Sequence, residues 1–156
     1  MTIYEVTKNE FLISTDKQKL DVQLIVNYLS NESYWAKNIP VHIVEKSIAG
    51  SLCFAVYEKK NEKEQQVGFA RVITDHATFA YLADVFILEQ FRGKGLSKWL
   101  IQEIMHHPEL QGLRRWMLAT KDAHGLYAQF GFLPLDKPER IMGLKPFEEY
   151  PKTKSV

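Results

Sequence analysis

The residues best suited to chemistry in this chain lie in one short stretch, Gln90–Gly95, with the sequence Gln-Phe-Arg-Gly-Lys-Gly. An apolar run precedes it and an amphipathic run follows it, which indicates a strand, a turn and a helix. Gly93 and Gly95 can adopt positive φ and let an anion approach the main chain, while Arg92 and Lys94 add positive charge. The first N–H groups of a helix and its dipole also attract anions. We therefore expect a pyrophosphate-bearing molecule to bind at this turn.

Two better-known phosphate-binding loops do not fit this stretch. A Walker A loop needs GxxxxGK followed by Ser or Thr, but here Lys94 precedes Gly95, which is the wrong order. The dinucleotide fingerprint GxGxxG would require its third glycine at Lys98, and the stretch lies mid-chain instead of opening a βαβ array. Neither nucleotide-binding fold is supported.

A second motif lies downstream, in the segment 126–132 with the sequence Leu-Tyr-Ala-Gln-Phe-Gly-Phe. QxxGxG at a strand-to-helix turn, followed by this LYxxxGF, resembles the GNAT superfamily of N-acetyltransferases. The resemblance covers residues 67–144 in the order of strands and helices, and the rest of the chain more weakly. It implies an α+β fold in which one GNAT domain spans residues 1–156. That fold has a central mixed, mostly antiparallel sheet of about six to seven strands, flanked by about four helices.

The family's sheet splays between its fourth and fifth strands, and acyl-CoA lies in the opening. By resemblance, these strands are residues 79–88 and 116–119 here. The co-substrate is then acetyl-CoA, with main-chain N–H groups of the first of these strands facing its pantetheine arm and thioester carbonyl. The implied contacts are Val85, Phe86, Ile87, Gln90, Arg92, Gly93, Lys94, Gly95, Leu96, Ser97, Thr120, Tyr127 and Phe130.

Two positions depart from the family pattern. Thr120 stands where many relatives have Asn, and its shorter side chain reaches less far toward the pantetheine. Glu89 replaces a commoner proline before the glycine turn, which makes the turn less rigid. Both departures concern residues around the cofactor, and neither removes the phosphate-binding turn.

Tyr127 matches the family tyrosine that lies near the CoA sulfur and acts as general acid. A phenol with a pKa near 10 is protonated at neutral pH and can donate its proton to a departing thiolate. Without the motif, we would interpret this residue as a core tyrosine packing behind Phe130 and Phe132. With the motif, we expect Tyr127 to be catalytic.

Asp84 is the only charged side chain in the apolar run from Phe79 to Leu88. Burying a carboxylate is costly unless it is paired. Asp84 therefore either pairs with a cation such as Arg71, or has a raised pKa and accepts a proton from the amine as general base. The sequence leaves both roles open, together with a third route in which backbone-bound water takes the proton.

The acceptor in this family is selected by the first two helices and their connection, which here carry Glu32, Tyr34 and Trp35. Two aromatic rings beside a carboxylate can hold an ammonium group by cation–π and charge contacts. The alternative for Trp35 is a lid on the core. His76, in the turn before the predicted central strand, is also expected on the acceptor side.

Capping residues and apolar periodicity predict the helices. Asp21 is expected to cap a helix whose apolar residues recur at i, i+3, i+4 and i+7 from Val22. Pro40 precedes a second helix over 41–48, which Gly50 ends. Two further helices are expected at 96–105 and at 123–130, the latter capped by Asp122.

Apolar runs between turn residues predict the strands. A short first strand is expected at 4–7 or 11–14, followed by an antiparallel hairpin of 52–57 and 66–74 with a charged connection over 58–65. The run 79–88 is expected to be the central strand because it is almost wholly apolar. Further strands are expected at 116–119, 132–133 and 141–144, and the tail 146–156 is expected to be loosely held.

Length and composition are those of one globular domain: 156 residues, 46% hydrophobic and 25% charged. A net charge of +1 without an evident basic face argues against a nucleic-acid partner. No apolar run reaches the roughly 18 residues of a membrane span, and the N-terminus lacks a signal-peptide pattern, so we expect a cytoplasmic protein without membrane contact. Cys53 is expected to be a buried thiol, and no metal site is predicted because the histidines lack ligand spacing.

Together these observations predict an N-acetyltransferase that transfers an acetyl group from acetyl-CoA to a primary amine of a small molecule, by direct attack in a ternary complex. Two alternatives stay open. One is a GNAT-like module that binds acyl-CoA without turnover, for which Thr120 is the reason, and the other is an enzyme that acetylates a protein N-terminus or lysine. The sequence leaves open the acceptor, the acyl group beyond acetyl, and whether the protein forms a homodimer.

Overall fold

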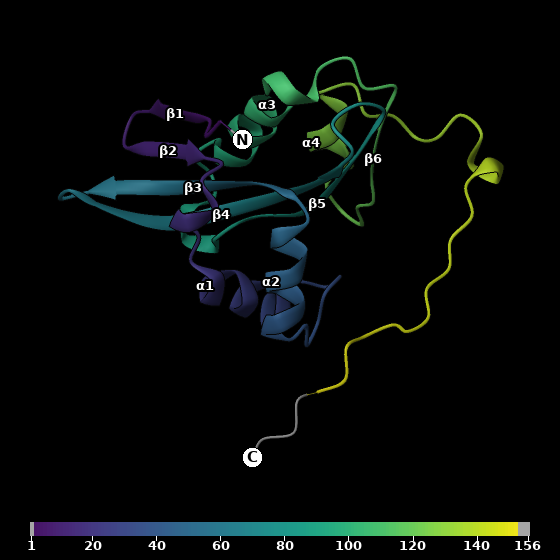
Figure 1. Ribbon diagram of the computed structural model, residues 1–156, viewed down its shortest axis with the longest axis horizontal. Helices are drawn as coiled ribbons and strands as arrows, with labels where there is room; N and C mark the ends of the chain where they lie inside the picture. Colours follow the sequence, from purple (N-terminus) through teal and green to yellow (C-terminus); the bar gives the residue numbers. More distant parts are fainter. Residues whose placement is uncertain (1, 153–156) are drawn as a thin grey trace.

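Six strands form a mixed sheet in which their spatial order follows their order in the chain (Figure 1). This computed structural model describes residues 2–152. Neighbouring strands are antiparallel from β1 to β5, and β6 runs parallel to β5. The arrangement confirms the predicted α+β fold. The strands are β1 (Glu5–Lys8), β2 (Phe11–Ser14), β3 (Leu52–Lys60), β4 (Lys63–Thr74), β5 (Phe79–Ile87) and β6 (Arg115–Leu118).

Helices cover both faces of the sheet, with α1 and α2 below it and α3 and α4 above it in Figure 1. The four α-helices of the described chain are α1 (Val22–Asn27), α2 (Val41–Ala49), α3 (Leu96–His106) and α4 (His124–Ala128). A π-helical turn, η2 (Tyr28–Glu32), extends α1. The short 3₁₀ turns are η1 (Lys17–Lys19), η3 (Glu89–Phe91), η4 (Pro108–Leu110) and η5 (Pro138–Arg140).

Each face of the sheet carries its own apolar core, because side chains alternate along a strand. On β3, Phe54 and Val56 pack with α3, whereas Cys53 and Ala55 pack with α1 and α2. Cys53 is buried as predicted, and burial raises the pKa of its thiol to about 11. The central strands are therefore covered on both sides, which explains their nearly continuous apolar sequences.

The helix-capping predictions are correct for the first two helices. Asp21 caps α1, since its side chain accepts a hydrogen bond from the Leu24 N–H at 3.0 Å. Gly50 follows α2 as its C-cap. The hairpin connection, in contrast, is shorter than the predicted 58–65, because β3 and β4 extend to a two-residue turn at Asn61 and Glu62, both with positive φ.

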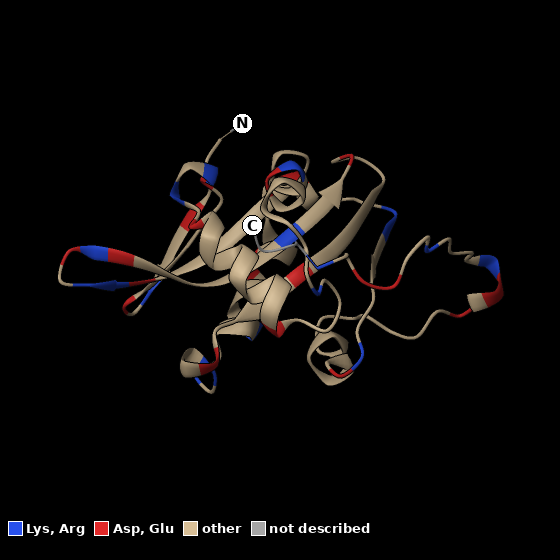
Figure 2. Ribbon diagram, turned by 90° about the horizontal axis from the view of Figure 1, so that it is seen from below, with Lys and Arg blue, Asp and Glu red and all other residues tan. Residues whose placement is uncertain are grey.

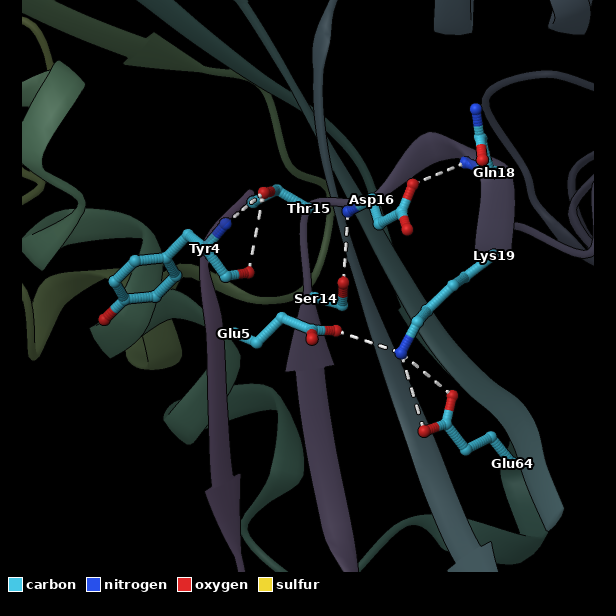
Figure 3. A network of polar contacts seen from close by, with 8 residues as sticks. All are labelled: Tyr4, Glu5, Ser14, Thr15, Asp16, Gln18, Lys19 and Glu64. Carbon is cyan, nitrogen blue, oxygen red and sulfur yellow. Dashed lines mark hydrogen bonds and ion pairs between the residues drawn. The ribbon is translucent and has the colours of Figure 1, made fainter. Parts of the chain in front are cut away.

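A polar network joins the N-terminal strands to the connection before α1 (Figure 3). Lys19 Nζ lies 3.0 Å from a carboxylate oxygen of Glu5 on β1 and 3.2 Å from one of Glu64 on β4. Asp16 accepts the Gln18 N–H at 3.0 Å, which caps η1. Both sequence candidates for a first strand form, as the hairpin of β1 and β2. The network thereby fixes the chain that leads into α1.

The segment after α4 differs from the prediction. The expected strands at 132–133 and 141–144 are wrong, since the described chain has no strand after β6 and contains only η5 there. Prolines at 134, 138 and 146 remove backbone donors from this stretch. We call residues 131–150 the C-terminal arm; it swings away from the domain and returns below α2 in the view of Figure 1. Its exposed large apolar side chains are Leu133, Leu135, Ile141, Met142, Leu144 and Phe147.

Charged residues of both signs are interspersed over the elements seen in Figure 2, including the tip of the β3–β4 hairpin and the outer bend of the C-terminal arm. None of the helices in the described chain is long and apolar enough to cross a membrane. Residues 2–152 also contain no group of three or more His, Cys, Asp or Glu side chains placed to hold a metal ion. Of the predicted loose tail, residues 153–156 lie outside the described residues.

Candidate active site

The strands β5 and β6 separate partway along their length. Their parallel pairing covers only four residues of β5, from Phe79 opposite Arg115 to Leu82 opposite Leu118. There β6 ends, while β5 continues to Ile87. A cavity of about 580 Å³ lies at this opening, lined by residues of both strands. The predicted splay between these two strands is therefore confirmed.

A β-bulge in β5 lies where the two strands part. Phe69 of β4 is opposite Phe86 and Arg71 is opposite Ala83, so Asp84 and Val85 together face one residue of β4. Asp84 has a φ of +55°. A bulge redirects side chains and leaves main-chain groups of the extra residue unpaired. This local irregularity brings Asp84 and Val85 to the cavity, which both of them line.

Beyond the bulge, main-chain groups of β5 alternate between β4 and the opening. The Leu88 N–H donates to the Val67 carbonyl at 2.8 Å, on the β4 side. Ile87, the preceding residue, therefore turns its N–H and C=O toward the side that β6 has left. Its carbonyl accepts a hydrogen bond from Arg92 Nε at 3.1 Å. The main-chain N–H and C=O of Phe86 point toward β4. Its ring stacks on that of Tyr28, with the centroids 3.9 Å apart.

Asp84 is paired on both of its oxygens. Arg71 Nε donates to Oδ2 at 2.9 Å, and Trp35 Nε1 donates to Oδ1 at 2.9 Å. The side chains of Arg71 and Asp84 are 16% and 10% exposed. Arg71 also donates to the Ser51 hydroxyl at 3.1 Å. The sequence left two roles open for Asp84, pairing with a cation and accepting a proton. Arg71 is the cation that the first role requires.

Tyr127, on α4, is buried and lines the cavity. Burial raises the pKa of its phenol to about 12, with smaller contributions from Tyr34 and Asp122. The turn before α4 is held by Thr120, whose hydroxyl accepts the Ala123 N–H at 3.0 Å. The predicted cap at Asp122 is wrong, because Ala123 occupies the cap position without a side-chain bond. Thr120 itself lines the cavity beside Tyr127.

The connection between η2 and α2, residues 33–40, crosses the cavity, and we call it the strap. The Tyr34 hydroxyl accepts the Lys121 N–H at 2.8 Å, just beyond the end of β6. Trp35 reaches Asp84 on β5, and the Tyr34 and Trp35 rings pack edge to face at 5.0 Å. The two neighbouring aromatic residues therefore contact both of the separated strands. Both line the cavity, and their contact with the acceptor stays a prediction.

The glycine turn has the backbone that the sequence predicts for an anion site. Gly93 and Gly95 have φ of +80° and +76°, and Gly95 is the N-cap of α3. Within residues 2–152, the turn's hydrogen bonds do not use the N–H groups of Gly93 to Ser97. Lys94 is exposed beside them. Arg92 is engaged elsewhere, because its guanidinium donates to the Ile87 carbonyl and, at 3.0 Å, to the Tyr28 hydroxyl.

Other predicted site residues lie away from the cavity. Glu32 is exposed at the end of η2, and His76 is exposed in the β4–β5 turn; the cavity lining includes neither. Phe130 packs against the core on the α3 side. The lining residues that sequence reasoning missed include Ser47, Tyr81 and Tyr150. Tyr81 lies in the predicted central strand, but no motif marks it or the other two.

The arrangement suits acetyl-CoA on grounds of shape and donor groups. A Cβ built on Gly93 or Gly95 would meet no protein atom within 4 Å, so the turn opens to space that a diphosphate can enter. The free N–H groups there and the start of α3 supply positive potential. The opened edge of β5 offers main-chain groups along the path from this turn to Tyr127. The residues present therefore fit the co-substrate.

Comparisons with known proteins agree with this geometry. The family described as Acetyltransferase (GNAT) domain matches residues 49–134. A candidate acetyltransferase of Gibberella zeae is 32% identical to the chain, over 96% of the chain and 88% of its own length. A solved structure of a candidate GNAT acetyltransferase from Xanthomonas campestris pv. campestris has 50% identity and a TM-score of 0.82, covering 86% of this chain and 92% of that one.

A more distant structure shares the fold and has the co-substrate bound. It is a GNAT family acetyltransferase from Elizabethkingia anophelis in complex with acetyl-CoA, with 13% identity and a TM-score of 0.59 over 83% of this chain and 80% of that one. The matched family spans β3 to α4, the part of the chain that contains the glycine turn, the bulge and Tyr127. The chain belongs to the GNAT family and is an acetyltransferase.

Proposed function

We propose that the protein transfers the acetyl group of acetyl-CoA to the primary amine of a small molecule by direct attack in a ternary complex. One observation carries the proposal: a continuous cavity joins the opened edge of β5 and Tyr127 to the aromatic residues of the strap. Acetyl-CoA and the acceptor can therefore bind in this cavity at the same time. Acetyl-CoA supplies the activated acetyl group as a thioester.

The glycine turn holds the diphosphate in this proposal. The N–H groups of Gly93, Lys94, Gly95, Leu96 and Ser97 follow one another into the start of α3, and the charge of Lys94 adds to their positive potential. Gln90 precedes this set at the entry to the turn. Arg92 contributes indirectly, because its bonds to Ile87 and Tyr28 brace the turn against β5 and η2.

The opened edge of β5 orients the reactive end. The N–H groups of Ile87 and, two residues earlier, Val85 face the opening, where they can bind the pantetheine arm and polarise a carbonyl. Thr120 faces this edge from the end of β6. Donors that are already in place when the carbonyl binds need no reorganisation during the reaction.

Tyr127 holds the proton that the departing thiolate needs. With a pKa of about 12, the phenol is protonated throughout the physiological pH range. It gives up this proton only when negative charge develops beside it in the buried site. Asp84 supports the site through Arg71 and Trp35, and its pairing favours this role over that of general base.

The strap favours a small acceptor over a peptide. Tyr34 binds Lys121 and Trp35 binds Asp84, so two side chains cross the space that a peptide groove would need. An amine library assayed for CoA release, with products identified by mass spectrometry, tests the proposal. We expect acetyl-CoA-dependent mass gains on small primary amines and none on peptides. Saturable acetyl-CoA binding without any acetylated amine would contradict it.

A further inference from the structure

Four aromatic side chains line the cavity on the α2 side, together with Ala36, Ile39, Ile43 and Ser47 of the strap and α2. Along β5, Ala80 and Leu82 face the core beneath α3, so Tyr81 points to the opposite face, toward α2. Tyr34 and Trp35 enter from the strap, and Tyr150 enters from the end of the chain. We call the part of the cavity bounded by these four rings the acceptor half. Flat or apolar groups bury surface well against such walls.

The charges that line the cavity cancel one another. Arg71 and Asp84 form an ion pair at 2.9 Å, and the second Asp84 oxygen is taken by Trp35. The remaining two, Lys121 and Asp122, are exposed neighbours of opposite sign near the end of β6. Among the described residues that line the cavity, there is no cluster of free carboxylates that could bind a polyamine. There are also no two free cations that could bind a phosphorylated amine. The acceptor half therefore matches a molecule with a single charge at most.

Tyr150 reaches the cavity from an otherwise exposed stretch of chain. From residue 133 to residue 149 every residue is exposed, whereas Tyr150 is half-buried and packs against the core of α1 and α2. Phe147 packs edge to face on it, with ring centroids 5.1 Å apart. In Figure 1 the yellow part of the chain comes back toward the domain below α2. The arm thus delivers one aromatic side chain to the acceptor half.

We propose that the acceptor is a monoamine with an aromatic or otherwise apolar carbon body, and that Tyr150 is a specificity-determining residue that contacts this body. The inference rests on the proposed function and narrows its substrate class. Tyr150 forms the wall that the strap and β5 leave open. Its position in the arm makes the C-terminal part of the chain necessary for a complete acceptor site.

The test compares three amines and three variants. Among 2-phenylethylamine, spermidine and glucosamine 6-phosphate, we expect the highest kcat/KM for 2-phenylethylamine. Tyr150→Ala should raise the KM for 2-phenylethylamine about 2- to 12-fold, the range of one aromatic contact, and leave the KM for acetyl-CoA unchanged. Tyr150→Phe keeps the ring, so its KM for 2-phenylethylamine should lie closer to the wild-type value than that of Tyr150→Ala. Leu144→Ala, which alters a 91% exposed residue of the same arm outside the cavity, is the matched control and should behave as wild type.

The outcomes separate this inference from the proposed function. A higher kcat/KM for spermidine or glucosamine 6-phosphate would overturn the monoamine assignment while acetyl transfer stands. An unchanged KM in Tyr150→Ala would overturn the role of Tyr150. If no amine is acetylated, the proposed function fails, and calorimetry of 2-phenylethylamine with the CoA-bound protein still decides the inference. Weaker binding to Tyr150→Ala would then support it, and equal or absent binding would refute it.

Discussion

Replacing Tyr127 by phenylalanine removes one hydroxyl at the point where the proposed chemistry occurs. The ring keeps its packing, including the edge contact with Phe132 at 6.0 Å between centroids. Within residues 2–152, no side-chain hydrogen bond involves the Tyr127 hydroxyl, and Tyr127 lines the cavity. We therefore expect Tyr127→Phe to change the free energy of unfolding by less than about 1 kcal/mol. Any large loss of turnover then reports on chemistry and not on folding.

The size of that loss follows from the acidity of the phenol. General acid catalysis contributes about 10²- to 10⁴-fold, which corresponds to about 2.7 to 5.4 kcal/mol of transition-state stabilisation. Burial raises the pKa of Tyr127 to about 12, which keeps the proton in place but makes the group a weaker acid. We expect the lower end of the range, a fall in kcat of about 100-fold for Tyr127→Phe.

The pH dependence gives a second, independent signature. With a pKa of about 12, only about one Tyr127 in a thousand is ionised at pH 9. The ratio of wild-type to Tyr127→Phe kcat should therefore stay constant from pH 6 to pH 9. CoA release at saturating amine and acetyl-CoA measures kcat, and calorimetry should give the same acetyl-CoA affinity for both proteins. Tyr81→Phe, which removes another hydroxyl of the cavity wall, is the control and should lose less than about threefold in kcat.

A small effect would refute the reasoning. If Tyr127→Phe lost less than about threefold in kcat, as in the control, the hydroxyl would not serve as general acid. A ratio that shrank between pH 7 and pH 9 would mean that the group titrates there, contrary to its burial. Equal falls in kcat and in acetyl-CoA affinity would assign the hydroxyl to binding.

Two further predictions concern the glycine turn and a buried histidine. Gly93→Val should lower acetyl-CoA affinity at least about 100-fold in calorimetry, because its side chain blocks the approach of the diphosphate. Gly112→Val introduces the same kind of strain, at φ +76° and again with open space around the Cβ, and should keep that affinity; equal losses would sink the anion-site argument. Burial lowers the pKa of His107, whose Nδ1 accepts the Glu109 N–H and so needs the neutral ring. Because the imidazole binds a proton more readily in the unfolded chain than in the folded one, His107 contributes its full share to the free energy of unfolding above about pH 6.5. This contribution falls as the pH drops below that value. In His107→Asn, the midpoint of urea unfolding should change less between pH 7.5 and pH 5.5 than in the wild type. An equal change in both proteins would contradict this.

Local signals predicted those elements whose determinants lie within a few residues of one another. The cap at Asp21 and the glycine end of α2 depend on adjacent backbone groups, which a sequence displays directly. The predicted cap of α4 at Asp122 failed, since Ala123 takes the cap position and the Thr120 hydroxyl accepts the Ala123 N–H in the turn before it. The two strands expected after α4 were wrong although β6, at the end of the described sheet, leaves its outer edge unpaired. The prolines at 134, 138 and 146 interrupt this segment, and they have no N–H to donate to a neighbouring strand.

In the candidate site, too, features that depend on neighbouring residues were predicted, and features that depend on distant residues were not. The glycine turn and Tyr127 were found from short motifs, because each motif lies on one element. The pairing of Asp84 with Trp35 joins residues 49 positions apart, and the wall at Tyr150 depends on the path of the whole arm. Likewise, the bulge at Asp84 depends on the register between β4 and β5, which no spacing in the chain reveals. Long-range geometry of this kind required the structure.

The opening of the sheet and the ion pair at its base are parts of one arrangement. A residue other than glycine at positive φ, such as Asp84, costs about 1 to 3 kcal/mol and persists only where its surroundings hold it. Here Arg71 and Trp35 hold the carboxylate from two sides, so the bonds that neutralise the charge also maintain the bulge. The bulge lies just beyond the last residue paired with β6, where the edge of β5 becomes free. A carboxylate in an apolar strand is therefore explained by the cleft it helps to form, without any need for it to exchange protons.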